Sequence, residues 1–168
     1  MKKSLQVIDS ISEWSGKVFM WFLLFLTLIL CFEVFMRYVL NNPTTYSYEL
    51  STMMGVVIGA GGLAYTHLHD GHIRVDVLWR RLSPRGRALA DIIGSIVFFW
   101  PLMALMVWAS TRWVIYSYSV KEISQMSYMY PIVWPVRAVM LIGFFLIIPQ
   151  DVVKFILNIY ILRGKKLP

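Results

Sequence analysis

The residues best placed to do chemistry are an acid and an arginine four positions apart. Glu33 and Arg37 stand in a largely apolar stretch, and side chains four apart on a helix share a face. A lone carboxylate in a membrane helix would suit a proton or coupling-ion site. The neighbouring guanidinium favours the ionised carboxylate, which makes Glu33 a poor proton carrier. Glu49 follows at a similar expected depth. Two interpretations stay open: an ion or substrate site, or a structural ion pair joining helices or subunits.

Three histidines, His67, His69 and His72, form the other candidate set. Three neutral imidazoles could bind zinc, but positions two apart point to different faces of a helix, and no cysteine lies near them. The sequence also has no nucleophile elbow, phosphate loop or HExxH motif. We therefore expect a polar loop here, with no metal, no cofactor and no enzymatic activity.

The elements that must position these residues are membrane-spanning helices. The chain has 168 residues, of which 58% are hydrophobic and 15% charged, whereas soluble domains carry about 25% charged residues. A hydrocarbon core is crossed by about 20 apolar helical residues. We predict an all-α membrane protein with a single domain over residues 1–168 and four transmembrane helices, at 17–39, 46–67, 89–118 and 133–157.

The basic residues predict the orientation. Twelve of the 16 Lys and Arg residues fall before or at the start of the first predicted span, between the second and third, or in the last turn of the fourth and beyond it. Short basic loops remain cytoplasmic, so both termini are expected inside. The net charge of +7 then reflects topology and lipid contact, and nucleic-acid binding is not expected. The arginines expected to set orientation and contact headgroups are Arg80, Arg81, Arg85 and Arg87.

Two segments have the spacing of amphipathic helices that lie in the membrane interface. The first is 4–16, with Ile11 and Trp14 on its apolar face, and the second is 69–83, in the cytoplasmic loop. Ser83 followed by Pro84 predicts a helix N-cap and first helical position. Pro101 is expected to kink the third span or loosen one of its hydrogen bonds.

Small residues recur along the second predicted span at four-residue intervals. Such spacing lets another helix approach closely in a membrane. We therefore predict a helix-packing face on this span, formed by Ser51, Gly55, Gly59, Ala60 and Ala64.

Three stretches together resemble the small integral-membrane subunit of the tripartite ATP-independent periplasmic (TRAP) transporters. They are EVFMRYVLNNP at 33–43, GHIRVD at 71–76, and YPIVWPVRAVMLIGFFLIIPQDVVKFI at 130–156. The resemblance covers essentially the whole chain. It adds Arg74 and Asp76 to the candidate ion-pair and subunit contacts formed by Glu33, Arg37 and Glu49. Family members often carry a second acid beside the residue matching Glu49, whereas this chain has Tyr48 and Leu50 there.

The resemblance implies a function as well as a fold. The small subunit of such transporters forms a complex with a large permease subunit, and a periplasmic binding protein delivers an organic acid. An ion gradient, usually of sodium, drives uptake. The large subunit holds the substrate and ion sites, and the small subunit braces it as a scaffold. The alternative is a stand-alone homodimer of four-helix chains that exports small molecules by proton exchange at Glu33.

Overall fold

The computed structural model describes residues 2–69, 82–125 and 131–164, and in these ranges the chain is helical apart from its connections. One isolated β-bridge joins Ile123 to Ile132 in the connection near the last helix. The elements are α1 (Lys2–Tyr38), α2 (Ser47–Leu68), α4 (Pro84–Gly94), the π-helical turn η1 (Ser95–Phe99), α5 (Trp100–Ser119) and α6 (Trp134–Leu162).

α1 is one continuous helix of 37 residues, so the segment predicted as a separate helix at 4–16 is joined to the span without a break. The physical reason is that one side of this segment packs against the rest of the chain. Ser12 and Ser15 on that side are 2% and 3% exposed, and Ser12 bonds to Gln150 of α6, so the segment is held in line with the span. α1 ends at Tyr38, and the connection turns at Asn41, whose φ of 49° is a left-handed conformation that asparagine tolerates.

The third helical rod runs from Pro84 to Ser119 through α4, η1 and α5. Its start confirms the predicted cap, since Ser83 Oγ accepts a hydrogen bond from the Gly86 amide at 3.2 Å. The predicted irregularity beside Pro101 takes the form of a π turn, in which the Trp100 amide donates to the Ser95 carbonyl. Proline has no amide hydrogen and its ring crowds the preceding turn, and a widened turn relieves that crowding.

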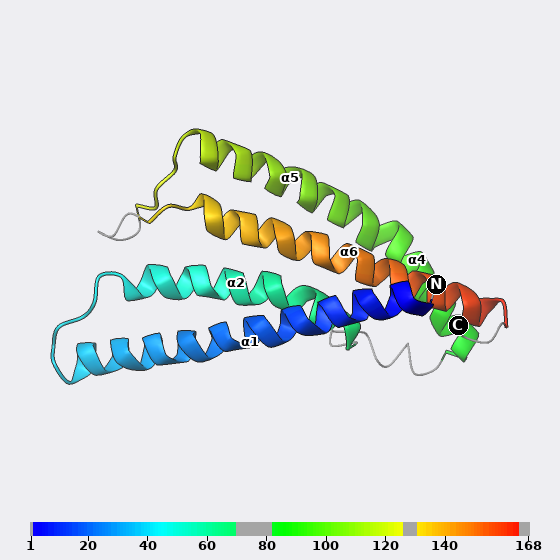
Figure 1. Cartoon of the computed structure of the whole chain (residues 1–168), viewed down its shortest axis with the longest axis horizontal. Helices are drawn as coiled ribbons and strands as arrows, with labels where there is room; N and C mark the ends of the chain where they lie inside the picture. Colours follow the sequence, from blue (N-terminus) through cyan, green and yellow to red (C-terminus); the bar gives the residue numbers. More distant parts are fainter. Residues whose placement is uncertain (1, 70–81, 126–130, 165–168) are drawn as a thin grey trace.

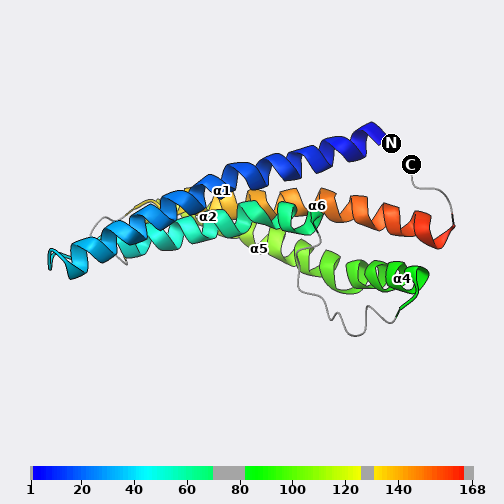
Figure 2. The same ribbon diagram turned by 90° about the horizontal axis from the view of Figure 1, so that it is seen from below.

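The helices form a row, with α1 beside α2, α2 beside α6, and α6 beside α5. Figure 1 shows α1 and α5 at the two edges and α2 and α6 in the middle. α1 begins and α6 ends at the same end of the molecule (Figures 1 and 2), and α4 packs on α6 there. We call this the inner end, because the basic residues predict that it faces the cytoplasm; the opposite end is the outer end.

Three helical rods are long and apolar enough to cross a membrane among the described residues: Gln6–Tyr38, Pro84–Ser119 and Trp134–Leu162. The second predicted span, α2, has 22 residues but is not apolar enough to join them. Its glycines, hydroxyl side chains, Glu49 and His67 lower its hydropathy. The prediction of four apolar spans therefore holds for three, and α2 is a helix of spanning length that packs between α1 and α6.

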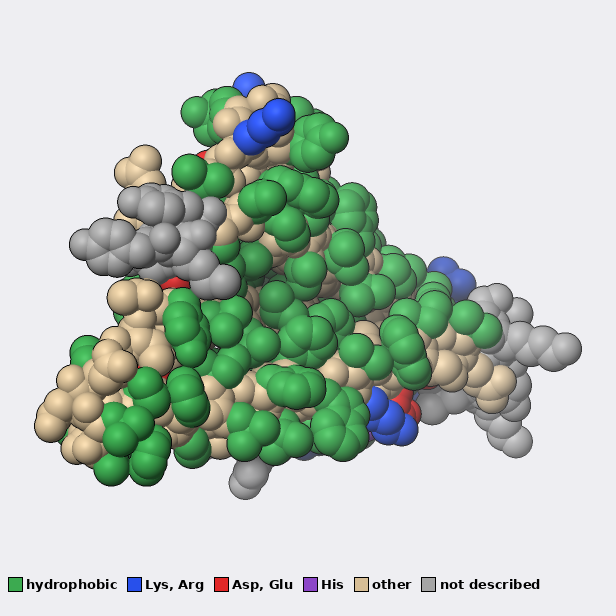
Figure 3. Space-filling model, turned by 60° about the vertical axis from the view of Figure 1, so that its left-hand side comes forward, with side chains coloured by type: hydrophobic (Ala, Val, Ile, Leu, Met, Phe, Trp, Pro, Cys, Tyr) green, Lys and Arg blue, Asp and Glu red, His purple; other side chains and the backbone are tan. Residues whose placement is uncertain are grey.

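A single row of helices leaves much apolar surface uncovered. In the most apolar stretch of each rod, 6% of the α1 residues, none of the Pro84–Ser119 residues and 28% of the α6 residues are buried. Figure 3 shows hydrophobic side chains over most of the visible face. Such a surface is suited to contact with lipid hydrocarbon or with another membrane protein.

Candidate functional site

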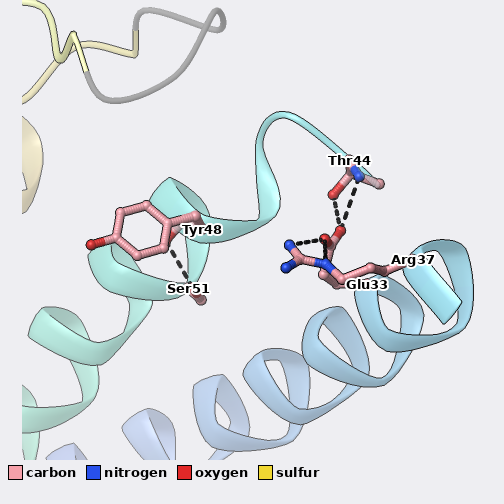
Figure 4. Close-up of polar contacts among 5 residues, drawn as sticks. All are labelled: Glu33, Arg37, Thr44, Tyr48 and Ser51. Atoms are coloured by element: carbon pink, nitrogen blue, oxygen red, sulfur yellow. Dashed lines mark hydrogen bonds and ion pairs between the residues drawn. The ribbon is translucent and has the colours of Figure 1, made fainter. Parts of the chain in front are cut away.

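The predicted ion pair lies at the outer end of α1. Arg37 Nη2 is 2.6 Å and its Nε 3.0 Å from Glu33 Oε1. The second carboxylate oxygen of Glu33 accepts bonds from the Thr44 amide, at 3.1 Å, and from the Thr44 hydroxyl. Figure 4 shows Thr44 reaching toward the pair from the connection that leads to α2. Glu33 is 8% exposed, so its carboxylate is a buried acceptor that ties this connection to α1.

Glu49 belongs to a different site. It is 4% exposed and lines a cavity of about 520 Å³ together with Thr52, Glu122 and Arg137. Arg137 binds Glu122 through both terminal nitrogens, each at 2.7 Å. This bidentate pair joins the start of α6 to the connection that follows α5, and such geometry is the strong form of an ion pair. The structure therefore brings Glu33 and Arg37 together and places Glu49 beside the second pair.

The predicted packing face of α2 divides into two parts. Ala60 and Ala64 are 7% and 0% exposed, and a Cβ added to Gly143 of α6 would lie 2.3 Å from the Ala60 carbonyl oxygen. This is a close helix crossing. At Gly55 and Gly59, an added Cβ would have no atom of another described element within 4 Å. Ser51 donates to the Tyr48 carbonyl in its own helix at 2.8 Å (Figure 4).

The sequence analysis missed a buried carboxylate at the inner end. Asp151 of α6 is 3% exposed, and it accepts from Ser95 Oγ at 3.2 Å and from Trp100 Nε1 at 2.8 Å. Ser95 begins the π turn and Trp100 directly follows it. His67 Nε2 of α2 is 3.3 Å from the same carboxylate, and the His67 ring stacks on Phe99 with centroids 5.7 Å apart. One side chain thus joins α2, α6 and the third rod.

The residue before it extends the same cluster to α1. Gln150 is 1% exposed; its Oε1 accepts from Ser12 Oγ and its Nε2 donates to Asp9 Oδ1, both at 3.0 Å. We call Asp9, Ser12, His67, Ser95, Trp100, Gln150 and Asp151 the inner cluster. A polar Gln-Asp pair after Pro149 in an apolar segment was the available signal. A polar group buried in such a segment is costly unless it is bonded.

The remaining predicted residues have separate locations. His69 lies against Tyr65, with ring centroids 4.4 Å apart. Within the described ranges, no three His, Cys, Asp or Glu side chains gather as metal ligands would. Arg87 Nε donates to the Leu82 carbonyl at 3.1 Å, and Arg85 lies in the first turn of α4. Arg74, Asp76, Arg80, Arg81, His72 and most of the predicted 69–83 helix lie outside the described residues.

Comparison with protein families gives a match over most of the chain. The family of tripartite ATP-independent periplasmic transporters, DctQ component, matches residues 26–159. The chain belongs to this family. Comparison with curated proteins and with solved structures gave no match. The family assignment makes the chain a multi-pass membrane component of a TRAP transporter, as the resemblance of its motifs had predicted.

The DctQ match covers the outer contact completely and the inner cluster only in part. The Glu33–Arg37–Thr44 contact and the α6 half of the inner cluster lie within residues 26–159. Asp9 and Ser12, which bind Gln150, precede the matched region. In this TRAP component, the first turns of α1 are therefore attached to α6 through Asp9 and Ser12, which precede the matched region.

Proposed function

We propose that this chain is the small, non-catalytic scaffold subunit of its TRAP transporter. In this proposal it braces the large permease subunit in the bacterial inner membrane, with both termini in the cytoplasm. The complex takes up an organic acid that a periplasmic binding protein delivers, and a sodium gradient drives the uptake. Substrate and ion sites belong to the large subunit.

The observation that carries this proposal is that two buried acidic side chains within the helices bind other parts of the same chain. Glu33 binds Arg37 and the connection to α2, and Asp151 binds the third rod and lies beside His67. Both carboxylates are thus bound to neighbouring parts of the same chain. Buried polar groups held in this way specify how helices pack, which is what a rigid brace requires.

The surface of the row supports a membrane partner. α5 and α1 expose large apolar side chains along their length, and α2 carries the open positions Gly55 and Gly59. Helices in membranes associate through such small residues. We propose that Ser51, Gly55 and Gly59 contact the large subunit, and that Glu49, Arg74 and Asp76 contribute to subunit contacts.

Co-expression tests the proposal. The affinity-tagged chain should retain the large permease subunit from the same transporter through purification in mild detergent. Proteoliposomes holding both subunits and the binding protein should accumulate the organic acid when a sodium gradient is applied. Vesicles holding this chain alone should accumulate none. Solute movement by the isolated chain, particularly movement abolished by Glu33→Gln, would instead identify a stand-alone transporter.

A further inference from the structure

The inner arm of α1, residues 6–16, buries two serines and exposes large apolar side chains beside the polar Gln6, Ser10 and Glu13. Ser12 and Ser15 are 2% and 3% exposed, whereas Val7, Ile11 and Trp14 are 56%, 48% and 69% exposed. A helix on the surface of a water-soluble protein shows the reverse pattern, with its apolar stripe turned toward the core. The outward face of the arm, Val7–Ile11–Trp14, therefore fits an apolar surrounding.

Hydrogen bonds hold the arm in this rotation. The Ser12 hydroxyl donates to the Gln150 side-chain oxygen, and the Asp9 carboxylate accepts from the Gln150 side-chain nitrogen. Both side chains of the arm are therefore bonded to α6. Other hydroxyls are satisfied within the helix itself: Ser15 donates to the Ser12 carbonyl and Ser10 to the Gln6 carbonyl, each at 2.8 Å. Hydroxyls that are hydrogen-bonded to the backbone of their own helix are compatible with an apolar surrounding, where no water is present to bond to them.

The outward face of the arm lies on the same side of α1 as exposed residues of its membrane-spanning part. Trp21 follows Trp14 by seven residues, two helical turns, and Phe25, Leu28, Phe32 and Phe35 follow at intervals of three or four residues, each about half exposed. At about 1.5 Å per residue, the face from Val7 to Phe35 is about 42 Å long. A bilayer core is about 30 Å thick, so the whole face is too long for a helix that stands upright.

We propose that the face Val7–Ile11–Trp14 contacts lipid at the boundary between headgroups and acyl chains, in the leaflet at the inner end. Because α1 is one continuous helix, in this proposal it crosses the bilayer at an incline, which keeps the arm in lipid. The exposed pair of Lys17 and Glu13, 3.2 Å apart, is compatible with this placement, because the long Lys17 side chain can extend toward the headgroups.

Lipid fits this face better than a helix of another subunit does. The outward side chains are bulky and protruding, with Trp14 and Trp21 among them, whereas close helix association in membranes uses small residues. The open small positions lie on α2, at Gly55 and Gly59. Tryptophan is moreover the residue that membrane interfaces favour. This inference is independent of the proposed function, because it concerns lipid contact by the chain itself.

Spin labels can measure the surrounding directly. The background is Cys31→Ser, which removes the chain's one cysteine. Val7→Cys and Ile11→Cys report on the arm, Phe25→Cys on the middle of the span, and Asn42→Cys on the outer connection. Each labelled full-length variant is placed in nanodiscs of phosphatidylethanolamine and phosphatidylglycerol, with and without the large subunit. Collision rates are measured with oxygen, which enriches in lipid, and with a nickel chelate, which stays in water.

The proposal expects labels at positions 7 and 11 to favour oxygen over nickel, as at Phe25 and opposite to Asn42, in both preparations. Nickel access equal to that at Asn42 would place the arm in water and overturn the proposal. Loss of access to both reagents only when the large subunit is present would assign the face to that subunit, which also overturns it.

A milder variant gives an independent measurement. Trp14→Phe keeps the face apolar, and the difference between its fluorescence and that of the wild type isolates Trp14 from the other six tryptophans. Lipids brominated near the headgroup end of the acyl chain should quench this difference signal. Quenching by aqueous iodide in place of brominated lipid would contradict the proposal.

Discussion

The two ends of the helix row use buried polar groups in different ways. At the outer end, Glu33 bonds to a residue one turn away and to the connection that follows its own helix. At the inner end, Asp151 and Gln150 bond to residues more than 50 positions away in the chain, from α1 and the third rod. The outer contacts attach the end of α1 to the connection that follows it, whereas the inner contacts determine how separate helices pack together. Changes at the two ends should therefore have different effects on stability.

The largest effect is expected from Asp151→Ala. The Ser95 hydroxyl and the Trp100 ring N–H would lose their shared acceptor in a buried position, which costs about 2–4 kcal/mol in free energy of unfolding. Thermal unfolding of the purified chain in detergent measures the loss. Glu13→Ala is the matched control, since its pair with Lys17 is exposed and should change stability by less than about 1 kcal/mol. An equal loss of thermal stability in both variants would show that the buried and the exposed carboxylate contribute equally to stability.

Gly143→Ala tests the crossing of α2 and α6 between the two ends. The new methyl group would meet the Ala60 carbonyl oxygen at 2.3 Å, and the helices would have to separate, at a cost of about 1–3 kcal/mol. Gly94→Ala is the control, because a Cβ there has no described atom within 4 Å. Alanine should even stabilise that helical position by about 0.5–1 kcal/mol. A stabilised Gly143→Ala variant would show that the crossing is looser than described.

Gln150→Leu sharpens the comparison within the inner cluster. It removes the link to α1 while Asp151 stays in place, and we expect a loss of about 1–2 kcal/mol. Hydrogen exchange should increase in residues 6–16 of α1 and remain slow in residues 20–36, because only the arm depends on this contact. Uniformly faster exchange along α1 would mean that Gln150 supports the whole helix.

Glu33→Gln addresses the outer end. The neutral amide keeps the shape of the side chain and loses the charge that Arg37 and Thr44 bind. We expect a lower yield of the complex with the large subunit, with the sodium dependence of uptake unchanged in the complex that remains. A changed sodium stoichiometry with normal assembly would make Glu33 part of the transport mechanism.

The smallest effect on the chain itself is expected from Gly55→Leu. The structure has open space at this position, so thermal unfolding of the isolated chain should be unchanged. The complex with the large subunit should dissociate more readily, because a large side chain blocks close approach of a partner helix. Unchanged retention of the large subunit on an affinity column would exclude this face from the interface.

Local spacing predicted the contacts that form within one helix or across one connection. The Glu33–Arg37 pair and the Ser83 cap follow from intervals of three or four residues, which a helix converts directly into proximity. The inner cluster could not be predicted in this way. Bringing Asp151 to Ser95 requires the relative register of two helices, and no pattern within either helix specifies it.

The helix boundaries and the packing face of α2 were likewise predicted only in part from the sequence. The third rod starts at Pro84, where Ser83 and Pro84 predicted a helix start although the span itself was placed at 89–118, and α6 continues past residue 157 to Leu162. Small residues occur on more than one side of α2, and spacing alone could not show that Ala60 and Ala64, and not Gly55 and Gly59, face a neighbour in the same chain. That choice depends on where α6 lies.

The π turn positions the two hydrogen-bond donors that Asp151 receives from the third rod, Ser95 and Trp100. In a regular α-helix, residues five positions apart are separated by about 140° around the axis, at about 100° per residue, so Ser95 and Trp100 would point to different sides. A wider turn advances less per residue and brings the two side chains toward a common side. Winding the same residues, Ser95 to Trp100, as a regular α-helix would remove this wider turn. The hydroxyl and the indole would then diverge, and a single carboxylate could no longer serve both.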